Sequence, residues 1–186
     1  MKRNHRLLGG LFLVVALLGL PTAASAQQNE LYTFTVGVLG GLGGSIDAEP
    51  GDSLSNTGLQ LNLTMVTESQ THVGFRLGQL ALDDDEVFGS LTDADLSYVT
   101  LGGEYRFSEG FYESGIYIGL GGYRLEGTSF SGQDEQDTAI GLTIGLTGEF
   151  PINQWLGVLV ELSGHYADLE EAQIFAMGHA GVAIHF

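Results

Sequence analysis

The sequence predicts an all-β fold, an eight-stranded antiparallel up-and-down transmembrane β-barrel. Three observations support this prediction: residues alternate in character with a period of two, eight segments share that alternation, and the connections between them alternate in length. A period of two is typical of a β-strand with two unlike faces. The pattern is clearest from residue 138 to the end, where Ile140, Leu142 and Ile144 alternate with glycine and threonine.

Eight segments carry the alternation. Each is about as long as the 9–11 residues that a tilted membrane strand needs, or somewhat longer. An even number of antiparallel strands can close into a barrel that has no free edge. The predicted strands are residues 31–41, 57–67, 71–82, 95–107, 112–125, 137–150, 154–166 and 174–186.

The connections fall into two kinds. Long or acidic connections follow the first, third, fifth and seventh strands, at residues 42–56, 83–94, 126–136 and 167–173. Short turns follow the second, fourth and sixth strands, at residues 68–70, 108–111 and 151–153. Long loops at one rim and tight turns at the other predict an up-and-down barrel with both termini on the turn side.

The first 26 residues have the pattern of a cleaved secretory signal peptide. A basic start with Lys2, Arg3 and Arg6 precedes an apolar stretch over residues 7–20 and a small-residue cleavage site, Ala24-Ser25-Ala26. The alternative, a membrane-anchoring helix, fits less well because about 14 apolar residues fall short of the ~20 that a spanning helix needs. We therefore expect residues 1–26 to be removed and residues 27–186 to form the barrel domain.

Charge and cysteine content limit the classes of function. The chain has 6 basic and 23 acidic residues. Three of the basic residues lie in the predicted signal peptide, which leaves 3 basic against 23 acidic residues and a net charge of −20. Nucleic acid is excluded as a partner, because binding it requires cations that neutralise phosphates. The chain has no cysteine, so disulfides and thiol chemistry are excluded as well.

The signal peptide, the eight amphipathic strands, the alternation of loops and turns, and the terminal Phe186 resemble the small outer-membrane β-barrel proteins of the OmpA/OmpX type. This resemblance implies an integral protein of a Gram-negative outer membrane, in contact with membrane lipids and lipopolysaccharide. It also implies that the terminal strand, residues 182–186, is the signal read by the barrel-insertion machinery.

A soluble, lipocalin-like cup is the rival architecture, because it too is exported and eight-stranded. Such a cup needs an apolar inner face and a polar outer face. Here the less apolar phase consists mainly of Gly, Thr, Ser, Gln, Glu, Arg and His, which do not suit an apolar cavity. The apolar phase is also too continuous for a surface that faces water, which favours the membrane barrel.

The less apolar residues of the alternation, here called the inward phase, should face the inside of the barrel. They include a set of charged residues that we expect to form a lumen cluster. A turn at Glu109-Gly110 would place Arg106 opposite Glu113, and a last hairpin centred near Glu170 would place Glu161 opposite His179. Charges inside a barrel must be paired to be tolerated, and an eight-stranded barrel is narrow enough for side chains to fill. A structural plug is therefore favoured over a gate or a proton path. The predicted cluster is Arg76, Glu104, Arg106, Glu113, Glu149, Glu161 and His179, with Arg76 nearly level with Glu104 and with Tyr117 and Tyr123 above Arg106.

No metal site or cofactor is expected. His179 and His185 share a strand face but are six residues apart, roughly 20 Å along a strand. The acidic stretch that starts at Asp83 lacks the glycine and glutamate of a calcium-binding EF-hand loop, since Phe88 and Ala94 occupy those positions. Divalent-cation bridging from the acidic loops to lipopolysaccharide is left as an open alternative.

An enzyme hypothesis starts from His165-Tyr166-Ala167-Asp168, which resembles the His-Tyr-Ser segment of outer-membrane lipid A deacylases. Those enzymes use a serine activated by the histidine. Ala167 stands at the matching position without a hydroxyl, and Ser163 is about 7 Å from His165 along the strand, too far for activation. We therefore expect no catalytic residue.

Three functions follow, in order of preference. The first is a structural or surface-interaction role through acidic extracellular loops. The second is a narrow channel for small solutes, and the third is a lipid-modifying enzyme of the outer membrane.

Overall fold

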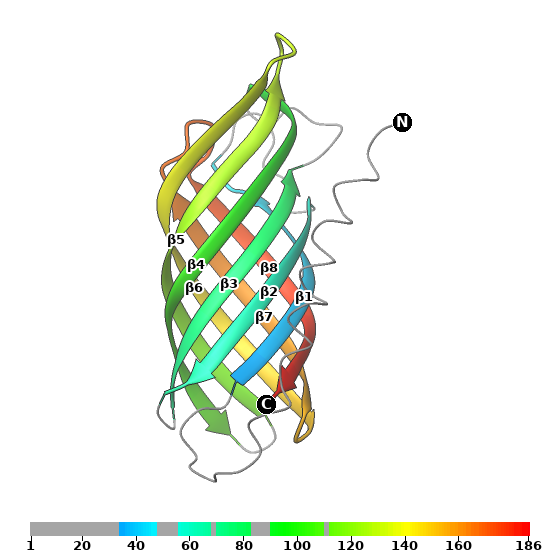
Figure 1. Ribbon diagram of the computed structural model, residues 1–186, viewed down its shortest axis with the longest axis vertical. Helices are drawn as coiled ribbons and strands as arrows, with labels where there is room; N and C mark the ends of the chain where they lie inside the picture. Colours follow the sequence, from blue (N-terminus) through cyan, green and yellow to red (C-terminus); the bar gives the residue numbers. More distant parts are fainter. Residues whose placement is uncertain (1–33, 48–55, 68–69, 83–89, 110–111) are drawn as a thin grey trace. The chain divides into compact units, whose positions relative to one another are not determined.

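Eight antiparallel strands close into a barrel in the computed structural model (Figure 1). The structure describes residues 34–47, 56–67, 70–82, 90–109 and 112–186. Every strand pairs with its neighbours in sequence, and β1 pairs with β8 to complete the ring. The strands are β1 (Phe34–Ser45), β2 (Asn56–Val66), β3 (Thr71–Leu82), β4 (Leu91–Glu109), β5 (Tyr112–Ser129), β6 (Asp134–Asn153), β7 (Leu156–Ala167) and β8 (Ile174–His185).

The predicted fold class is confirmed, but three strands are longer than predicted. β4, β5 and β6 extend well past the others at the end of the barrel where β4 begins and β5 ends, here called the loop end. The predicted long connection over residues 126–136 was wrong, because β5 and β6 continue as a paired hairpin and only residues 130–133 join them. Gly132 lies in this connection with a φ of 79°, which a glycine adopts without strain.

The opposite end, where β1 begins and β8 ends, is called the turn end. The predicted turn at residues 151–153 is the last part of β6, and residues 154–155 make the connection to β7. The predicted signal peptide, residues 1–26, and the acidic stretch from Asp83 to Glu86 lie outside the described residues.

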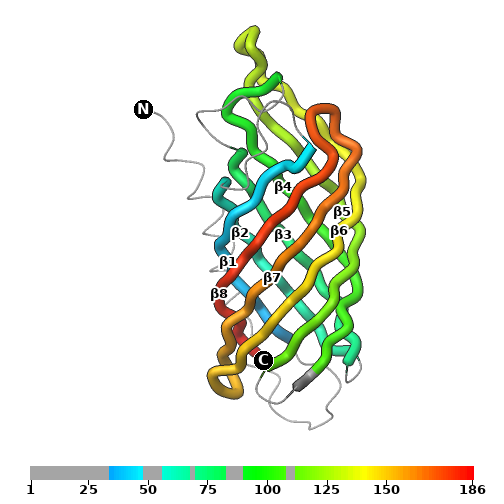
Figure 2. Tube along the Cα trace, turned by 180° about the vertical axis from the view of Figure 1, so that it is seen from behind, coloured from blue at the N-terminus to red at the C-terminus, as the bar shows by residue number. Residues whose placement is uncertain are grey.

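The two end strands lie side by side and form the seam of the barrel (Figure 2). Their register runs from Thr35 opposite His185 to Ser45 opposite Phe175. At the turn end the Phe186 N–H donates to the Phe34 carbonyl at 2.8 Å, and the Phe34 N–H donates to the Phe186 carbonyl at 3.2 Å. Phe186 therefore continues the seam hydrogen bonding beyond the last assigned strand residue.

An apolar belt covers the outer face of the barrel. The predicted outward orientation is confirmed on β6, where Leu142 and Ile144 are 51% and 58% exposed. At the turn end the outward side chains become aromatic, as in the girdles of membrane barrels. These aromatic residues are Phe34, Tyr105, Phe107, Phe150, Trp155 and Phe186. Among the described residues, no helix is long and apolar enough to cross a bilayer.

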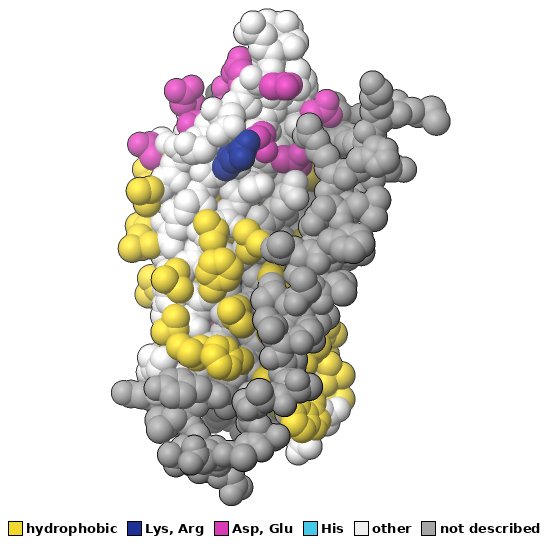
Figure 3. All heavy atoms as spheres, in the orientation of Figure 1, with side chains coloured by type: hydrophobic (Ala, Val, Ile, Leu, Met, Phe, Trp, Pro, Cys, Tyr) yellow, Lys and Arg dark blue, Asp and Glu magenta, His cyan; other side chains and the backbone are white. Residues whose placement is uncertain are grey.

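The outer face of the wall changes polarity toward the loop end. On β5 the outward phase runs through Ile118 and Leu120, and then continues with Arg124 and Glu126. Figure 3 shows acidic side chains above the apolar ones on one face of the barrel. An outer surface that changes from apolar to charged marks the level at which lipid gives way to water.

Candidate functional site

The half of the barrel nearer the turn end is here called the turn half, and the other is called the loop half. The interior of the turn half is filled by ion pairs centred on Arg76 of β3. Its Nε donates to both carboxylate oxygens of Glu161, at 3.0 and 2.9 Å, and its Nη2 donates to Glu104 Oε2 at 3.1 Å. The guanidinium also lies 3.4 Å from the centroid of the Tyr117 ring. Arg76 and both carboxylates are 1% exposed, so this cation is sequestered and paired, as a buried charge must be.

A second arginine continues the network toward the turn end. Arg106 Nε donates to Glu104 Oε1 at 2.7 Å, and its Nη1 donates to Glu149 at 2.8 Å and to Glu113 at 3.4 Å. Glu104 therefore bridges the two arginines. The Glu113 side chain is 43% exposed, which places it where the cluster meets solvent.

Other polar side chains extend the network in both directions. Toward the loop end, Gln60 and Asn62 each donate to Glu161 at 3.2 Å, and the Tyr98 hydroxyl donates to Gln60 Oε1 at 2.5 Å. Toward the turn end, His185 Nε2 lies 2.6 Å from Glu149 Oε1. A continuous hydrogen-bonded chain therefore runs from Tyr98 to His185.

The structure brings all six predicted arginine and glutamate residues into contact, although with a different register. Arg106 pairs with Gly115 and Ser108 pairs with Glu113, so the β4–β5 register is shifted by two residues from the prediction. Arg76 pairs with Thr100, four residues from Glu104. The long side chains span these offsets across the lumen.

The last predicted member, His179, lies opposite Glu161 on β8, as expected from the hairpin centred near Glu170. Its Nδ1 has no hydrogen-bond partner among the described residues, and the same holds for three other buried atoms: His72 Nδ1, Thr143 Oγ1 and Arg76 Nη1. Buried polar atoms without a protein partner commonly form hydrogen bonds with ordered water molecules.

The tyrosines do not stack together above Arg106 as predicted. Tyr117 lies under Arg76 and its hydroxyl is 3.1 Å from Thr100 Oγ1. Tyr123 lies nearer the loop end, stacked on Tyr98 with ring centroids 6.0 Å apart. Tyr98 and Tyr123 thus form the boundary between the ionic half of the interior and the half described next.

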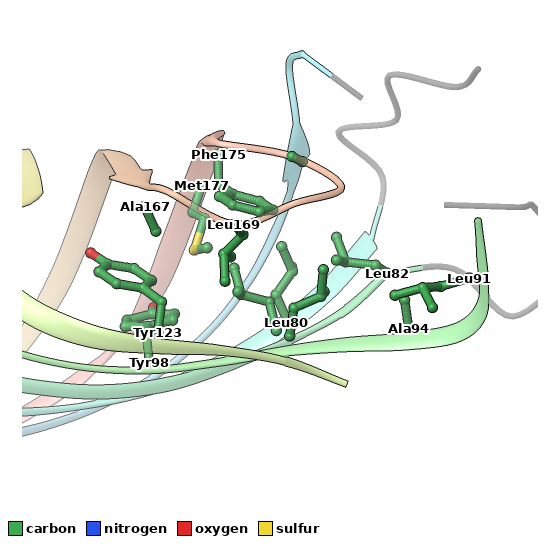
Figure 4. Close-up of a cluster of buried hydrophobic side chains, with 13 residues drawn as sticks. Leu80, Leu82, Leu91, Ala94, Tyr98, Tyr123, Ala167, Leu169, Phe175 and Met177 are labelled. Carbon is green, nitrogen blue, oxygen red and sulfur yellow. The ribbon is translucent and has the colours of Figure 1, made fainter. Parts of the chain in front are cut away.

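The interior of the loop half is an apolar plug, which was not predicted. Leu80, Leu96 and Phe175 have no measurable exposure, and Figure 4 shows Leu169 pointing toward Leu80 from the opposite side of the barrel. The expectation that the inward residues do not suit an apolar interior was therefore wrong for this half of the barrel. The plug comprises Leu80, Leu82, Leu91, Ala94, Leu96, Tyr98, Tyr123, Leu125, Ala167, Leu169, Ala172, Phe175 and Met177.

The β7–β8 connection, residues 168–173, lies over this plug as a lid. It contributes the buried Leu169 and Ala172. Hydrogen bonds from three directions hold it: Asp47 accepts from the N–H groups of Gln173 and Ile174 at 3.0 Å, Asp137 accepts from Glu170 N–H at 2.8 Å, and Glu171 accepts from Ser90 N–H at 2.9 Å. Several acidic residues of the loop end therefore fasten the lid.

A serine–histidine pair lies beside the plug, closer together than the strand spacing indicated. Ser163 Oγ is 2.9 Å from His165 Nε2, and His165 Nδ1 is 2.9 Å from the Tyr123 hydroxyl. The prediction that Ser163 is too far from His165 was wrong, because the two side chains lean toward each other. Both are buried inside the lumen, Ser163 at 6% and His165 at 1% exposure.

No family model matches the chain, and no curated protein matches its sequence. Solved structures do match its fold. A major outer membrane protein from Thermus thermophilus aligns with a TM-score of 0.63 and 15% identity, over 83% of this chain and 99% of that one. Neisserial surface protein A aligns with a TM-score of 0.62 and 11% identity, over 83% and 95% of the two chains.

The attachment invasion locus protein Ail of Yersinia pestis, solved with the heparin analogue sucrose octasulfate, aligns with a TM-score of 0.55 and 18% identity, over 83% of this chain and 97% of that one. The chain therefore has the fold of the small eight-stranded barrels of bacterial outer membranes. Its apolar belt and aromatic girdle are those of a barrel that lies in a membrane.

Proposed function

We propose that this outer-membrane barrel is a closed, non-enzymatic envelope protein that acts through its acidic loop end. The observation that supports this is the filled interior, with ion pairs in one half and an apolar plug in the other. The proposal includes cleavage of the signal peptide, residues 1–26, and a mature barrel domain of residues 27–186. It also includes reading of the terminal strand, with Phe186, by the barrel-insertion machinery.

The surface of the loop end is strongly acidic, and in the proposed orientation it faces the cell exterior. Arg124 is the basic residue of this region among the described residues. The described acids there are Asp47, Asp93, Asp95, Glu126, Asp134, Glu135, Asp137, Asp168, Glu170 and Glu171. A surface of one sign attracts partners of the opposite sign and repels those of its own. The partner is therefore cationic, unlike the polyanion bound to Ail.

A binding experiment tests the surface role. The barrel in neutral-lipid nanodiscs should bind oligolysine with an affinity that falls as salt increases, and it should not bind sucrose octasulfate. The double variant Asp134→Asn, Glu135→Gln, at an exposed part of β6, should weaken oligolysine binding. Binding of the polysulfate, or oligolysine binding that is insensitive to salt, would contradict the proposal.

The channel alternative receives limited support from the unpartnered polar atoms at Arg76, Thr143, His72 and His179, which favour water in the turn half. The plug offers no comparable polar path in the described part of the loop half. We therefore expect single ordered water molecules at these atoms, and no continuous column of water through the ion pairs or past Tyr98 and Tyr123.

The lipid-modifying alternative depends on Ser163 and His165. Both face the lumen, whereas a membrane lipid contacts the outer wall. Lipid A mass spectra from cells with and without the protein should be identical. A mass shift that disappears in Ser163→Ala would replace the structural role with a hydrolytic one.

A further inference from the structure

The outer wall carries a groove where its apolar belt meets the charged surface, across β3 to β6. Register places Val99, Gly122 and Ile140 in one row across β4, β5 and β6. The next row toward the loop end is Ser97, Arg124 and Thr138, one outward position farther along each strand. The boundary between lipid and water therefore passes between two adjacent rows of side chains.

Gly122 is what makes this groove. A Cβ at position 122 would meet no described atom nearer than Val99 Cγ1 at 3.9 Å, so the backbone there is open to the outside. Leu77, Val99 and Ile140 stand around the gap and are 42%, 40% and 81% exposed. The groove has a volume of about 470 Å³ and is apolar except at its upper margin.

That margin carries Arg124, the only arginine or lysine exposed on the outer surface among the described residues. Arg76 and Arg106 are buried in the lumen, whereas the Arg124 side chain is 49% exposed. Its Nη2 donates to Gln136 at 2.8 Å and pairs with Glu126. Ser97 and Thr138 are its direct neighbours on the adjacent strands, so a guanidinium and two hydroxyl-bearing residues lie in a row above the groove. Figure 3 shows a basic patch among acidic side chains above the apolar zone.

We propose that this groove binds one phosphate-bearing membrane lipid, with an acyl chain over Gly122 and the phosphate at Arg124. A guanidinium binds phosphate through two parallel hydrogen bonds, and hydroxyl groups donate to the remaining oxygens. The inference depends on the proposed membrane location of the barrel.

The surrounding charge selects a lipid rather than a soluble phosphate. Glu126 and Asp95 form the next outward pair toward the loop end, and their carboxylates repel an anion that approaches from the water. An anion carried by a lipid reaches Arg124 from the membrane side, where the neighbours are apolar. The acyl chain adds contact area that inorganic phosphate lacks.

Native mass spectrometry of the barrel released from mixed bilayers tests the proposal. The bilayers contain phosphatidylcholine with equal amounts of phosphatidic acid and diacylglycerol, which share acyl chains and differ in the phosphate. The wild-type barrel should retain one phosphatidic acid, preferred about tenfold or more over diacylglycerol, because one charge-assisted hydrogen bond is worth at least that factor. Added inorganic phosphate should not displace it.

Three variants separate the two parts of the site. Arg124→Gln should lose the preference for phosphatidic acid. Gly122→Leu should fill the groove and abolish retention of both lipids. Gly103→Leu is the matched control, because Gly103 also faces outward and a Cβ there would meet no described atom within 4 Å. This control should behave as wild type.

Equal retention of both lipids by the wild type, or unchanged retention in Gly122→Leu, would overturn the proposal. Displacement by inorganic phosphate would reassign the site to the free ion. Failure of the wild-type barrel to insert into any bilayer would instead refute the membrane location, so the two failures are distinguishable.

Discussion

The two halves of the barrel interior contain side chains of opposite polarity. In the turn half, Arg76 and Arg106 are paired with four glutamates. In the loop half, the same inward phase carries leucine, phenylalanine and methionine. The outer wall changes in the opposite sense, from an apolar belt to a charged surface. The interior of each half is therefore the reverse of its exterior.

The surroundings of each half explain this difference. In the membrane the outer side chains already face lipid, so the interior can be filled by groups that pair with one another. Beyond the membrane the wall faces water, and a β-structure in water is stabilised by burying apolar side chains. The loop half therefore resembles a soluble barrel built on top of a membrane barrel.

The largest effect is expected from removing the central cation of the turn half. Arg76→Ala leaves Glu104 and Glu161 buried without this cation, which should lower the free energy of unfolding by about 3–5 kcal/mol. The triple variant Arg76→Ala, Glu104→Gln, Glu161→Gln should recover part of that loss, because it removes the unpaired charges. Urea unfolding of the refolded barrel measures both. Equal midpoints for wild type and Arg76→Ala would show that the cluster is solvated.

The matching substitution in the loop half creates a cavity but leaves no charged group without its partner. Leu80→Ala removes a fully buried side chain from the plug and should cost about 2–5 kcal/mol. Unlike Arg76→Ala, its cost should not depend on pH, because no titrating group loses a partner. Unfolding midpoints at two pH values check this, and a loss that varies with pH would link the plug to the ionic network.

Three arginine substitutions on the outer face of β6 test where the membrane ends. Ile144→Arg should cost about 2–4 kcal/mol, and Phe150→Arg at the turn-end girdle should cost less. Thr138→Arg, six residues from Ile144 on the same face, should cost about 0–1 kcal/mol, as expected near an interface. Similar losses at Ile144 and Thr138 would contradict the boundary drawn between Ile140 and Thr138.

A smaller effect than in the network, the plug or the apolar belt is expected at the lid. Asp47→Ala removes the acceptor for the Gln173 and Ile174 N–H groups and should cost about 1–3 kcal/mol. Amide hydrogen exchange should increase in residues 168–174 and stay unchanged in β3. Asp134→Ala is a suitable control because it removes a loop-end acid that is not part of the lid hydrogen bonds described above. If amide exchange in residues 168–174 is the same in Asp47→Ala as in Asp134→Ala, Asp47 does not hold the lid.

Much of this comparison was readable from the sequence. Alternation predicted which residues of the central strands face inward, and Arg106 contacts Glu113 and Glu149 in a different register from the predicted one. The polarity reversal was also visible, because Gln79 and Arg124 fall in the phase that is apolar elsewhere, while Leu80 and Leu125 fall in the other. It was missed because a single polarity was assumed for each phase along the whole strand.

Other features could not be predicted from the pattern. The β4–β5 register depends on which two residues form the turn, and a shift by two keeps every side chain on its own face. The contact between Ser163 and His165 depends on side-chain rotamers, because strand spacing gives only the separation of their backbones. Long arginine and glutamate side chains hide such register errors, since they reach across several positions.

Single-channel recording of four forms of the barrel tests the central claim that two unlike seals close the lumen. The forms are wild type, a plug variant (Leu80→Ala, Leu169→Ala, Phe175→Ala), a network variant (Arg76→Ala, Glu104→Ala, Glu161→Ala) and the combination of both. Two seals in series predict that the wild type and each single-region variant pass no steady current and that only the combined variant conducts. A steady ohmic current through the wild type, or full conductance when the plug alone is removed, would contradict the account.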